Sequence, residues 1–322
     1  MNCYRIKRIY RDSGNSDLVF MLMDQPWIKY SFLGVLYAVA FNCLWVVSTQ
    51  LELIPNVVSW YLPAGLRICV FLFSPIRSWP YLFVIDRIAF LLLFHSGGWL
   101  SSPVFYPESL IWYVTHFVLY PFSFIFLLWQ YRKRFGTNVL TSLNNACALL
   151  VLFIVTSVTN ATLFVGRRAL DDPHVAINLI QNITNMALGD LVGIFFIFPL
   201  VLLTQKLLFH FDEKSVAAAG QCTVVWLFLL SGYFFLTIFH DGYDQYVKLV
   251  ALVPAMFYAF RYGVIGAMCS VFFVCAMTYM VALLTQGPTV ENQIYMIAIS
   301  ICLFLIAGAE FNKQQFSNHR PN

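Results

Sequence analysis

A few charged side chains lie inside long apolar segments of this chain, and they are the first candidates for chemistry. They are Arg67, the adjacent pair Asp86 and Arg87, and Asp190. A charged group at the centre of a bilayer costs about 2.5–3.5 kcal/mol on insertion scales, so these groups are expected to face protein or a polar cavity rather than lipid. The planar guanidinium of Arg67 can hold a carboxylate or a phosphate through two parallel bonds. Together with Asp86 or Asp190, and with Trp60 lining the mouth, it forms a candidate site for a small anionic ligand.

The same residues also allow a purely structural interpretation. Buried ion pairs commonly fix the register of helices without binding anything. Asp190 lies between Gly189 and Gly193, and small residues in a membrane helix allow another helix to approach closely. Asp190 is therefore either part of a hydrogen-bond network between helices or part of a proton or ion relay. The sequence leaves both interpretations open.

Motifs for catalysis and for metal binding are absent from the sequence. It contains no Walker loop, no Gly-x-Ser-x-Gly, no His-Glu-x-x-His and no dinucleotide-binding glycine fingerprint. The cysteines and histidines form no Cys-x-x-Cys and no His-x-x-x-His pair. The one tight basic triplet, 132–134, directly follows an apolar run and is typical of a topology anchor. We therefore expect no enzyme activity, no cofactor, no metal and no nucleic-acid partner.

Membrane helices must position these candidates. Hydrophobic residues make up 60% of the 322 residues and charged residues only 11%, against about 25% charged residues in a soluble domain. A bilayer core about 30 Å thick needs roughly 20 apolar residues per helix. We predict an all-α polytopic membrane protein with a bundle of about ten transmembrane helices (8–10). The expected segments are 30–51, 57–74, 79–95, 110–130, 139–164, 178–204, 222–240, 246–260, 263–285 and 292–310.

The distribution of positive charge predicts that both termini are cytoplasmic. With this topology most lysine and arginine residues fall on the inside, and the external loops hold Arg167, Arg168 and Lys248. Such an excess of positive charge is typical of cytoplasmic loops. We expect a cytoplasmic tail over 1–29, one transmembrane domain over 30–310 and a second cytoplasmic tail over 311–322.

Three stretches, in this order, resemble signatures of the bacterial membrane-associated sensor domain of the first MASE type. The first is Trp60-Tyr-Leu-Pro-Ala-Gly-Leu-Arg67 followed by Arg77-Ser-Trp-Pro80; the second is Gly189-Asp-Leu-Val-Gly193 followed by Pro199-Leu200; the third is Leu252-Val-Pro-Ala255 followed by Phe260-Arg-Tyr-Gly263. The motif residues that we expect to have structural roles are Pro63, Gly65, Trp79, Pro80, Gly189, Pro199, Pro254, Arg261, Tyr262 and Gly263.

The resemblance implies a multi-pass sensory module of the bacterial inner membrane. In this sequence, the pattern of Pro63–Arg67, a Trp-Pro step and Asp86 is similar to that in the membrane half of the hexose-phosphate-sensing histidine kinase. Such modules normally precede a histidine kinase or a cyclic-di-GMP synthase or hydrolase. No such domain follows Glu310 in this sequence. We therefore expect the chain, embedded in the lipid bilayer, to detect a small ligand and to signal through a missing output domain or a partner protein.

Two other functional classes stay open. A secondary transporter or channel would suit the proline-broken segments and the charges inside the membrane, although no inverted repeat is evident. An integral-membrane enzyme acting on lipid-linked substrates would need a nucleophile, a base or a metal cluster at one membrane face, and none is evident.

Overall fold

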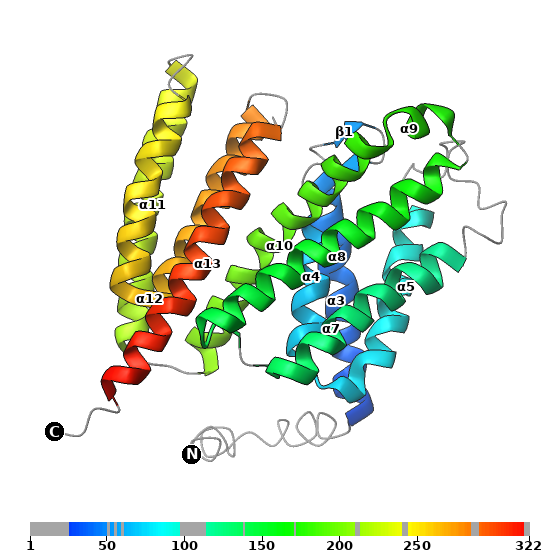
Figure 1. The fold of residues 1–322 in the computed structure, drawn as a ribbon, viewed down its shortest axis with the longest axis horizontal. Coiled ribbons are helices and arrows are strands. Elements are labelled where there is room, and N and C mark those ends of the chain that lie inside the picture. Colours follow the sequence, from blue (N-terminus) through cyan, green and yellow to red (C-terminus); the bar gives the residue numbers. More distant parts are fainter. Residues whose placement is uncertain are drawn as a thin grey trace, which may run out of the picture. The chain divides into compact units, whose positions relative to one another are not determined.

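The chain is helical apart from one short β-hairpin in the computed structural model, which describes residues 26–49, 52–54, 57–58, 61–96, 114–137, 139–170, 172–209, 213–239, 244–284 and 290–318 (Figure 1). In chain order the elements are α3 (Pro26–Thr49), β1 (Glu52–Ile54), β2 (Val57–Val58), α4 (Leu62–Phe73), the 3₁₀ turn η1 (Ile76–Ser78), α5 (Trp79–Ser96), the π-helical turn η4 (Thr115–Leu119), α7 (Tyr120–Phe135), α8 (Leu143–Ala169), α9 (Pro173–Ile177), α10 (Leu179–Phe209), α11 (Glu213–Phe239), α12 (Asp244–Leu284) and α13 (Val290–Asn318).

Among the described residues, 6 helices are long and apolar enough to cross a membrane. These stretches are Ser31–Thr49, Leu143–Ala169, Leu179–Leu207, Ser215–Phe235, Ala251–Met280 and Val290–Glu310. The prediction of an all-α polytopic membrane protein is thereby confirmed. The count of ten helices and the cytoplasmic position of both termini stay predictions.

The start of the second expected helix was wrong. We predicted a helix from residue 57, but Val57–Val58 form strand β2, antiparallel to β1, and α4 begins at Leu62. The β-branched valines favour extended backbone. Pro63, at the second position of α4, suits the first turn of a helix because the N–H group it lacks would have no partner within the helix.

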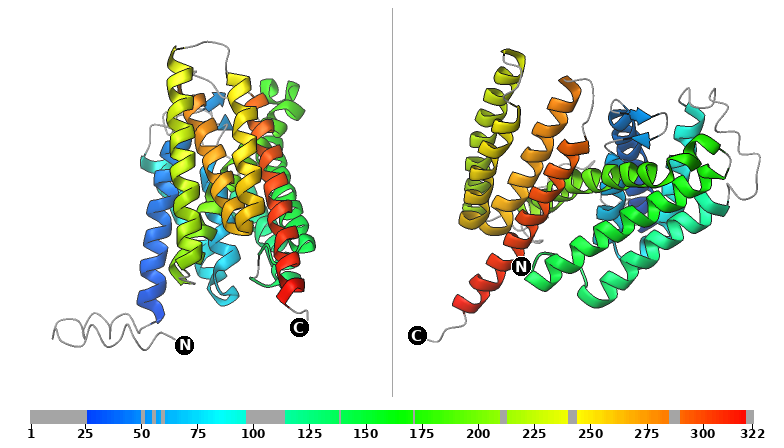
Figure 2. Two further views of the ribbon diagram at one scale, coloured as in Figure 1. Left: turned by 90° about the vertical axis from the view of Figure 1, so that its left-hand side faces the viewer. Right: turned by 45° about the horizontal axis from the view of Figure 1, so that its top comes forward.

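A reversal of chain direction divides α12 at Gly263. This residue has φ 56° and ψ −129°, which is not a helical conformation. A β-carbon on Gly266 would overlap the carbonyl of Tyr258, although these residues would lie about 12 Å apart along a straight helix. The two halves of α12 therefore fold back on each other (Figures 1 and 2). The boundary predicted between 246–260 and 263–285 is correct, and the apolar stretch Ala251–Met280 is not one continuous crossing.

The chain divides into two compact units. The first comprises the described residues of Met1–Cys43 and Pro75–Phe105, and the second those of Leu44–Ser74 and Tyr106–Asn322. In the first unit, α3 packs closely on α5, since a β-carbon on Gly34 would lie 2.7 Å from Tyr81 Oη and 3.2 Å from Ile85 Cγ1.

Helix α10 is the centre of the second unit. It packs against α4, α8, α12 and α13. In the 18-residue apolar window within Leu179–Leu207, 72% of the residues are buried, against 22% in the corresponding window within Ser215–Phe235 of α11. Four buried phenylalanine rings from α8, α10 and α13 pack together at its middle, with centroid distances of 5.2 to 6.1 Å: Phe153, Phe195, Phe198 and Phe304. Helix α10 thus connects four other helices of this unit, α4, α8, α12 and α13.

Candidate functional site

The N-terminus of α4 bonds to neighbouring helices instead of water. The first N–H groups of a helix have no partner within it. Here the Tyr61 N–H donates to the Gly189 carbonyl of α10 at 3.1 Å, and the Leu62 N–H donates to Ser48 Oγ of α3 at 3.1 Å. Pro63 has no N–H to satisfy. Backbone groups in a membrane interior require such partners within the protein. These bonds therefore allow the N-terminus of α4 to lie inside the bilayer.

Glycines bring the backbones of α4 and α10 together. A β-carbon on Gly65 would overlap the Gly193 carbonyl and lie 2.7 Å from Ile197 Cβ. A β-carbon on Gly193 would overlap the Tyr61 carbonyl and lie 2.9 Å from the Leu62 nitrogen. Small residues permit this kind of close helix contact in membranes. The first and second sequence signatures therefore meet in one interface.

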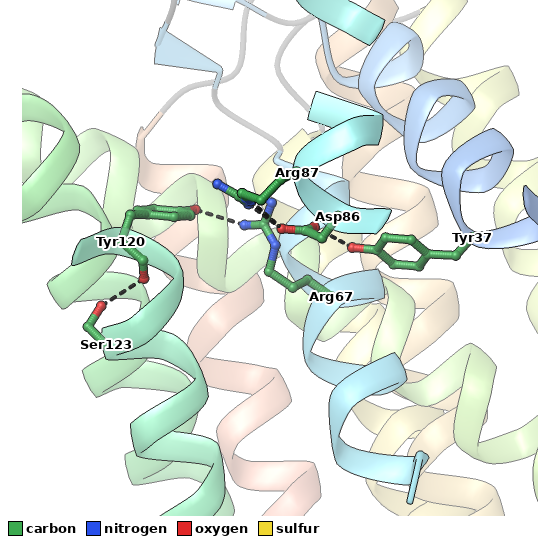
Figure 3. A network of polar contacts seen from close by, with 6 residues as sticks. All are labelled: Tyr37, Arg67, Asp86, Arg87, Tyr120 and Ser123. Atoms are coloured by element: carbon green, nitrogen blue, oxygen red, sulfur yellow. Dashed lines mark hydrogen bonds and ion pairs between the residues drawn. The ribbon is translucent and has the colours of Figure 1, made fainter. Parts of the chain in front are cut away.

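Arg67 extends from the same helix and reaches α7. Its side chain is buried, with 2% exposed, and Nη1 donates to the Tyr120 hydroxyl at 2.9 Å (Figure 3). The guanidinium carbon lies 5.4 Å from the centroid of the Tyr120 ring and 6.0 Å from that of Phe124, a geometry in which an aromatic ring attracts a cation. Ser123 Oγ donates to the Tyr120 carbonyl at 2.8 Å. Arg67 thereby links α4 to the start of α7.

Asp190 lies at the centre of the second unit and is fully buried in α10. Asn160 Nδ2 of α8 donates to its Oδ2 at 3.4 Å, and the positive charge of Arg67 acts on the carboxylate through space. Among the described residues, the other carboxylate oxygen, Oδ1, has no hydrogen-bond partner. A buried carboxylate without full hydrogen bonding is costly, so this group can accept a further donor or a cation.

Asp86 has its partners in the first unit. The Tyr37 hydroxyl of α3 donates to Asp86 Oδ1 at 2.5 Å, and Arg87 Nε donates to Oδ2 at 3.1 Å (Figure 3). The Arg87 guanidinium also forms an ion pair with this carboxylate and lies 5.6 Å from the Phe90 ring centroid. These contacts favour the structural interpretation for Asp86, which holds α3 and α5 in register.

The four residues of the predicted ligand site do not all belong to one unit of the chain. Arg67 and Asp190 act on each other within the second unit, Asp86 belongs to the first, and Trp60 lies outside the described residues. The sequence reasoning missed Tyr120 and Asn160. Asn160 could have been found as a polar side chain within the apolar segment 139–164, close to its end, but Tyr120 carries no such signal. Ligand binding by these residues stays a prediction.

Pro199 interrupts the hydrogen-bond ladder of α10, and a neighbouring helix restores the missing bond. A proline at this position leaves the Phe195 carbonyl without its usual donor within the helix. The thiol of Cys275, from the second half of α12, donates to that carbonyl at 3.6 Å. In a membrane helix, a carbonyl freed by proline needs such a partner from a neighbouring helix.

The remaining motif residues lie at breaks and ends of helices. Trp79 and Pro80 begin α5, and Pro254 lies inside the first half of α12. Arg261 and Tyr262 immediately precede the reversal at Gly263, where the Tyr262 hydroxyl donates to Gln221 Oε1 of α11. The third signature therefore forms the turn of α12 and fastens it to α11.

Comparison with known proteins identifies a family. The model of the MASE1 family matches residues 31–309. No curated protein and no solved structure matches the chain. The matched range includes all three signatures and nearly every described helix. The chain therefore belongs to the MASE1 family of membrane-associated sensory domains and is a multi-pass membrane sensor.

Proposed function

We propose that this chain is the sensing module of a signalling system in the bacterial inner membrane, and that it binds a small anionic ligand at Arg67. The carrying observation is the placement of Arg67, buried on the short helix α4 with its guanidinium bonded to Tyr120 and acting on Asp190. A guanidinium at such a position binds carboxylate or phosphate in two-bond geometry. Membership of a sensory family supports the sensor role.

Ligand binding would act by changing the partners of Arg67. An anion that engages the guanidinium competes with the Tyr120 hydroxyl and with the Asp190 carboxylate. Release of Tyr120 loosens α4 from α7, whereas the glycine contact keeps α4 on α10. The ligand shifts the equilibrium between these packings only as far as it binds one of them more tightly.

The change would leave the membrane through α13. The phenylalanine cluster joins α10 to α13, and α13 continues as a helix to Asn318, past the end of its apolar stretch at Glu310. With both termini cytoplasmic, this extension would meet a histidine kinase, a cyclase or another signalling protein, on the same chain or on a partner.

The first test is a mild-detergent pull-down of the chain from its native membrane, with an unrelated multi-pass protein of that membrane as control. We expect a histidine kinase, a cyclase or a response regulator among the specific partners. The activity of that partner should lose its response to the bound chain in Arg67→Gln, keep part of it in Arg67→Lys, and stay normal in Arg134→Gln, an exposed arginine at the end of α7.

Two results would contradict the proposal. If Arg67→Gln folds and signals normally, Arg67 is not the ligand site. If no signalling protein is recovered and the purified chain takes up solute in proteoliposomes, the chain is a secondary transporter.

A further inference from the structure

Three buried oxygen atoms without hydrogen-bond partners gather where α8 faces α10. They are Asp190 Oδ1, Asn160 Oδ1 and Ser157 Oγ, and none has a partner among the residues that the structure describes. The exposed fractions of these side chains are 0%, 4% and 0%. Each unsatisfied polar group buried in this way costs free energy, and a carboxylate costs more than a neutral group.

The three atoms share one interface. Phe153, Ser157 and Asn160 follow one another at helical spacing on a single face of α8. Phe153, at one end, packs edge-to-face against Phe195 and Phe198 of α10, with ring centroids 6.0 and 5.2 Å apart. Asn160, at the other end, donates to Asp190 of α10. Ser157 lies between these two contacts and therefore also faces α10.

The hydroxyl of Ser157 differs from two neighbouring hydroxyls of α8, because it has no hydrogen-bond partner among the described residues. The neighbouring Thr156 hydroxyl donates to the Leu152 carbonyl at 2.7 Å, and that of Thr162 donates to the Val158 carbonyl at 2.7 Å. Serine and threonine in membrane helices normally bond to their own backbone in this way. The Ser157 hydroxyl does not, so its oxygen stays available to a ligand.

We propose that Asp190, Asn160 and Ser157 form a binding site for a small monovalent cation, with Na⁺ as its chemical type. Carboxylate, amide and hydroxyl oxygens are the ligands that hard cations prefer. A single carboxylate matches a single positive charge. The cation occupies little volume, which suits side chains that are packed this closely.

The cation site adds to the proposed function. Its coupling to the anion site at Arg67 rests on that proposed function. With the Asp190 carboxyl ionised, Arg67 and Asp190 together carry no net charge. An anion at Arg67 alone would leave a net negative charge in the membrane interior, and a cation at Asp190 alone would leave a net positive one. Occupation of both sites restores neutrality, so the cation should strengthen binding of the anionic ligand, and the ligand should strengthen binding of the cation.

The test measures thermal unfolding of the full chain in lipid nanodiscs, in NaCl and in choline chloride at equal ionic strength. A cation that binds the folded chain raises the unfolding midpoint by mass action, and we expect a difference of about 2–5 °C at a tenfold excess over the dissociation constant. Asp190→Asn should abolish the difference and Ser157→Ala should reduce it. Thr162→Val, which removes a hydroxyl bonded to its own helix, should leave it unchanged.

The outcomes separate this proposal from the preceding one. Equal midpoints of the wild type in the two salts overturn the cation site, because an ordered water would satisfy the same atoms without preferring Na⁺ to choline. A sodium effect that survives in Asp190→Asn also overturns it. Arg67→Gln should keep the sodium effect, since loss of its positive charge favours a cation at Asp190. If Arg67→Gln keeps the sodium effect and also signals normally, the anion site is refuted and the cation site is not.

Discussion

Gly65 and Gly193 hold α4 and α10 at a distance that no other residue allows. Each β-carbon would overlap a backbone carbonyl of the facing helix rather than the flexible end of a side chain. Backbone cannot move aside without moving the helix. Because Gly65 and Gly193 lack β-carbons, α4 and α10 can approach closely, and this approach determines where Arg67 lies relative to Asp190.

Replacement of Gly193 by alanine should force the two helices apart. Overpacking of this kind costs about 1–3 kcal/mol, so Gly193→Ala should lower the unfolding midpoint in detergent. The matched control is Gly220→Ala, on an exposed part of α11 where a β-carbon meets nothing within 4 Å. Alanine there should be neutral or stabilise the helix by about 0.5–1 kcal/mol. Similar shifts in the two variants would show that the close contact of α4 with α10 is not real.

In α10, Pro199 interrupts the backbone hydrogen bonding, and a bond from α12 replaces the missing one. The Phe195 carbonyl that Pro199 leaves free is occupied by the Cys275 thiol, and Cys275 is fully buried. The hydrogen bonding of α10 at Pro199 thus depends on α12 staying in place. A shift of one helix requires the other to give up or replace this bond.

A double-mutant cycle tests that dependence. Cys275→Val removes the donor and keeps the volume, and leaving the Phe195 carbonyl unsatisfied should cost about 1–3 kcal/mol. Pro199→Ala supplies an N–H within α10 that can bond to the same carbonyl. In the Pro199→Ala background Cys275→Val should therefore cost much less. Equal costs in the two backgrounds, measured by thermal or denaturant unfolding, would show that the thiol does not serve the broken ladder.

The positions of many helices could be predicted from the sequence, because a membrane helix is recognised by the length of its own apolar segment. Apolar length identified the long helices, and the Arg-Tyr-Gly step marked the reversal inside α12. The start of α4 could not be predicted in this way, because it depends on Ser48 and Gly189, which come from two other helices.

The same limit applies to the site. Arg67 and Asp190 stood out as charges in apolar surroundings, but their partners Tyr120 and Asn160 are ordinary residues whose role comes only from the packing of α7 and α8. Spacing within one helix carries no information about which residue of another helix it will meet.

At the scale of the whole molecule, the distribution of lysine and arginine predicts the sidedness of the chain. Green fluorescent protein fused to the C-terminal end should fluoresce, and alkaline phosphatase fused there should stay inactive, because both results report a cytoplasmic location. Fusions at Asp172, between α8 and α9, should give the opposite pair of results. A C-terminal fusion with active phosphatase would refute the predicted topology and, with it, a cytoplasmic partner for α13.

The bonds that cap α4 also set an order of events during synthesis. Tyr61 leaves the ribosome long before Gly189, and at rates of about 5–20 residues per second the delay is on the order of ten seconds. During that interval the amide of Tyr61 lacks its carbonyl partner on α10. In the lipid, α4 would therefore expose an unsatisfied backbone N–H group. It must wait in the insertion machinery or at the water interface until α10 arrives. A short helix near the beginning of the chain would then settle late, and the ligand site would exist only once α10 has been synthesised.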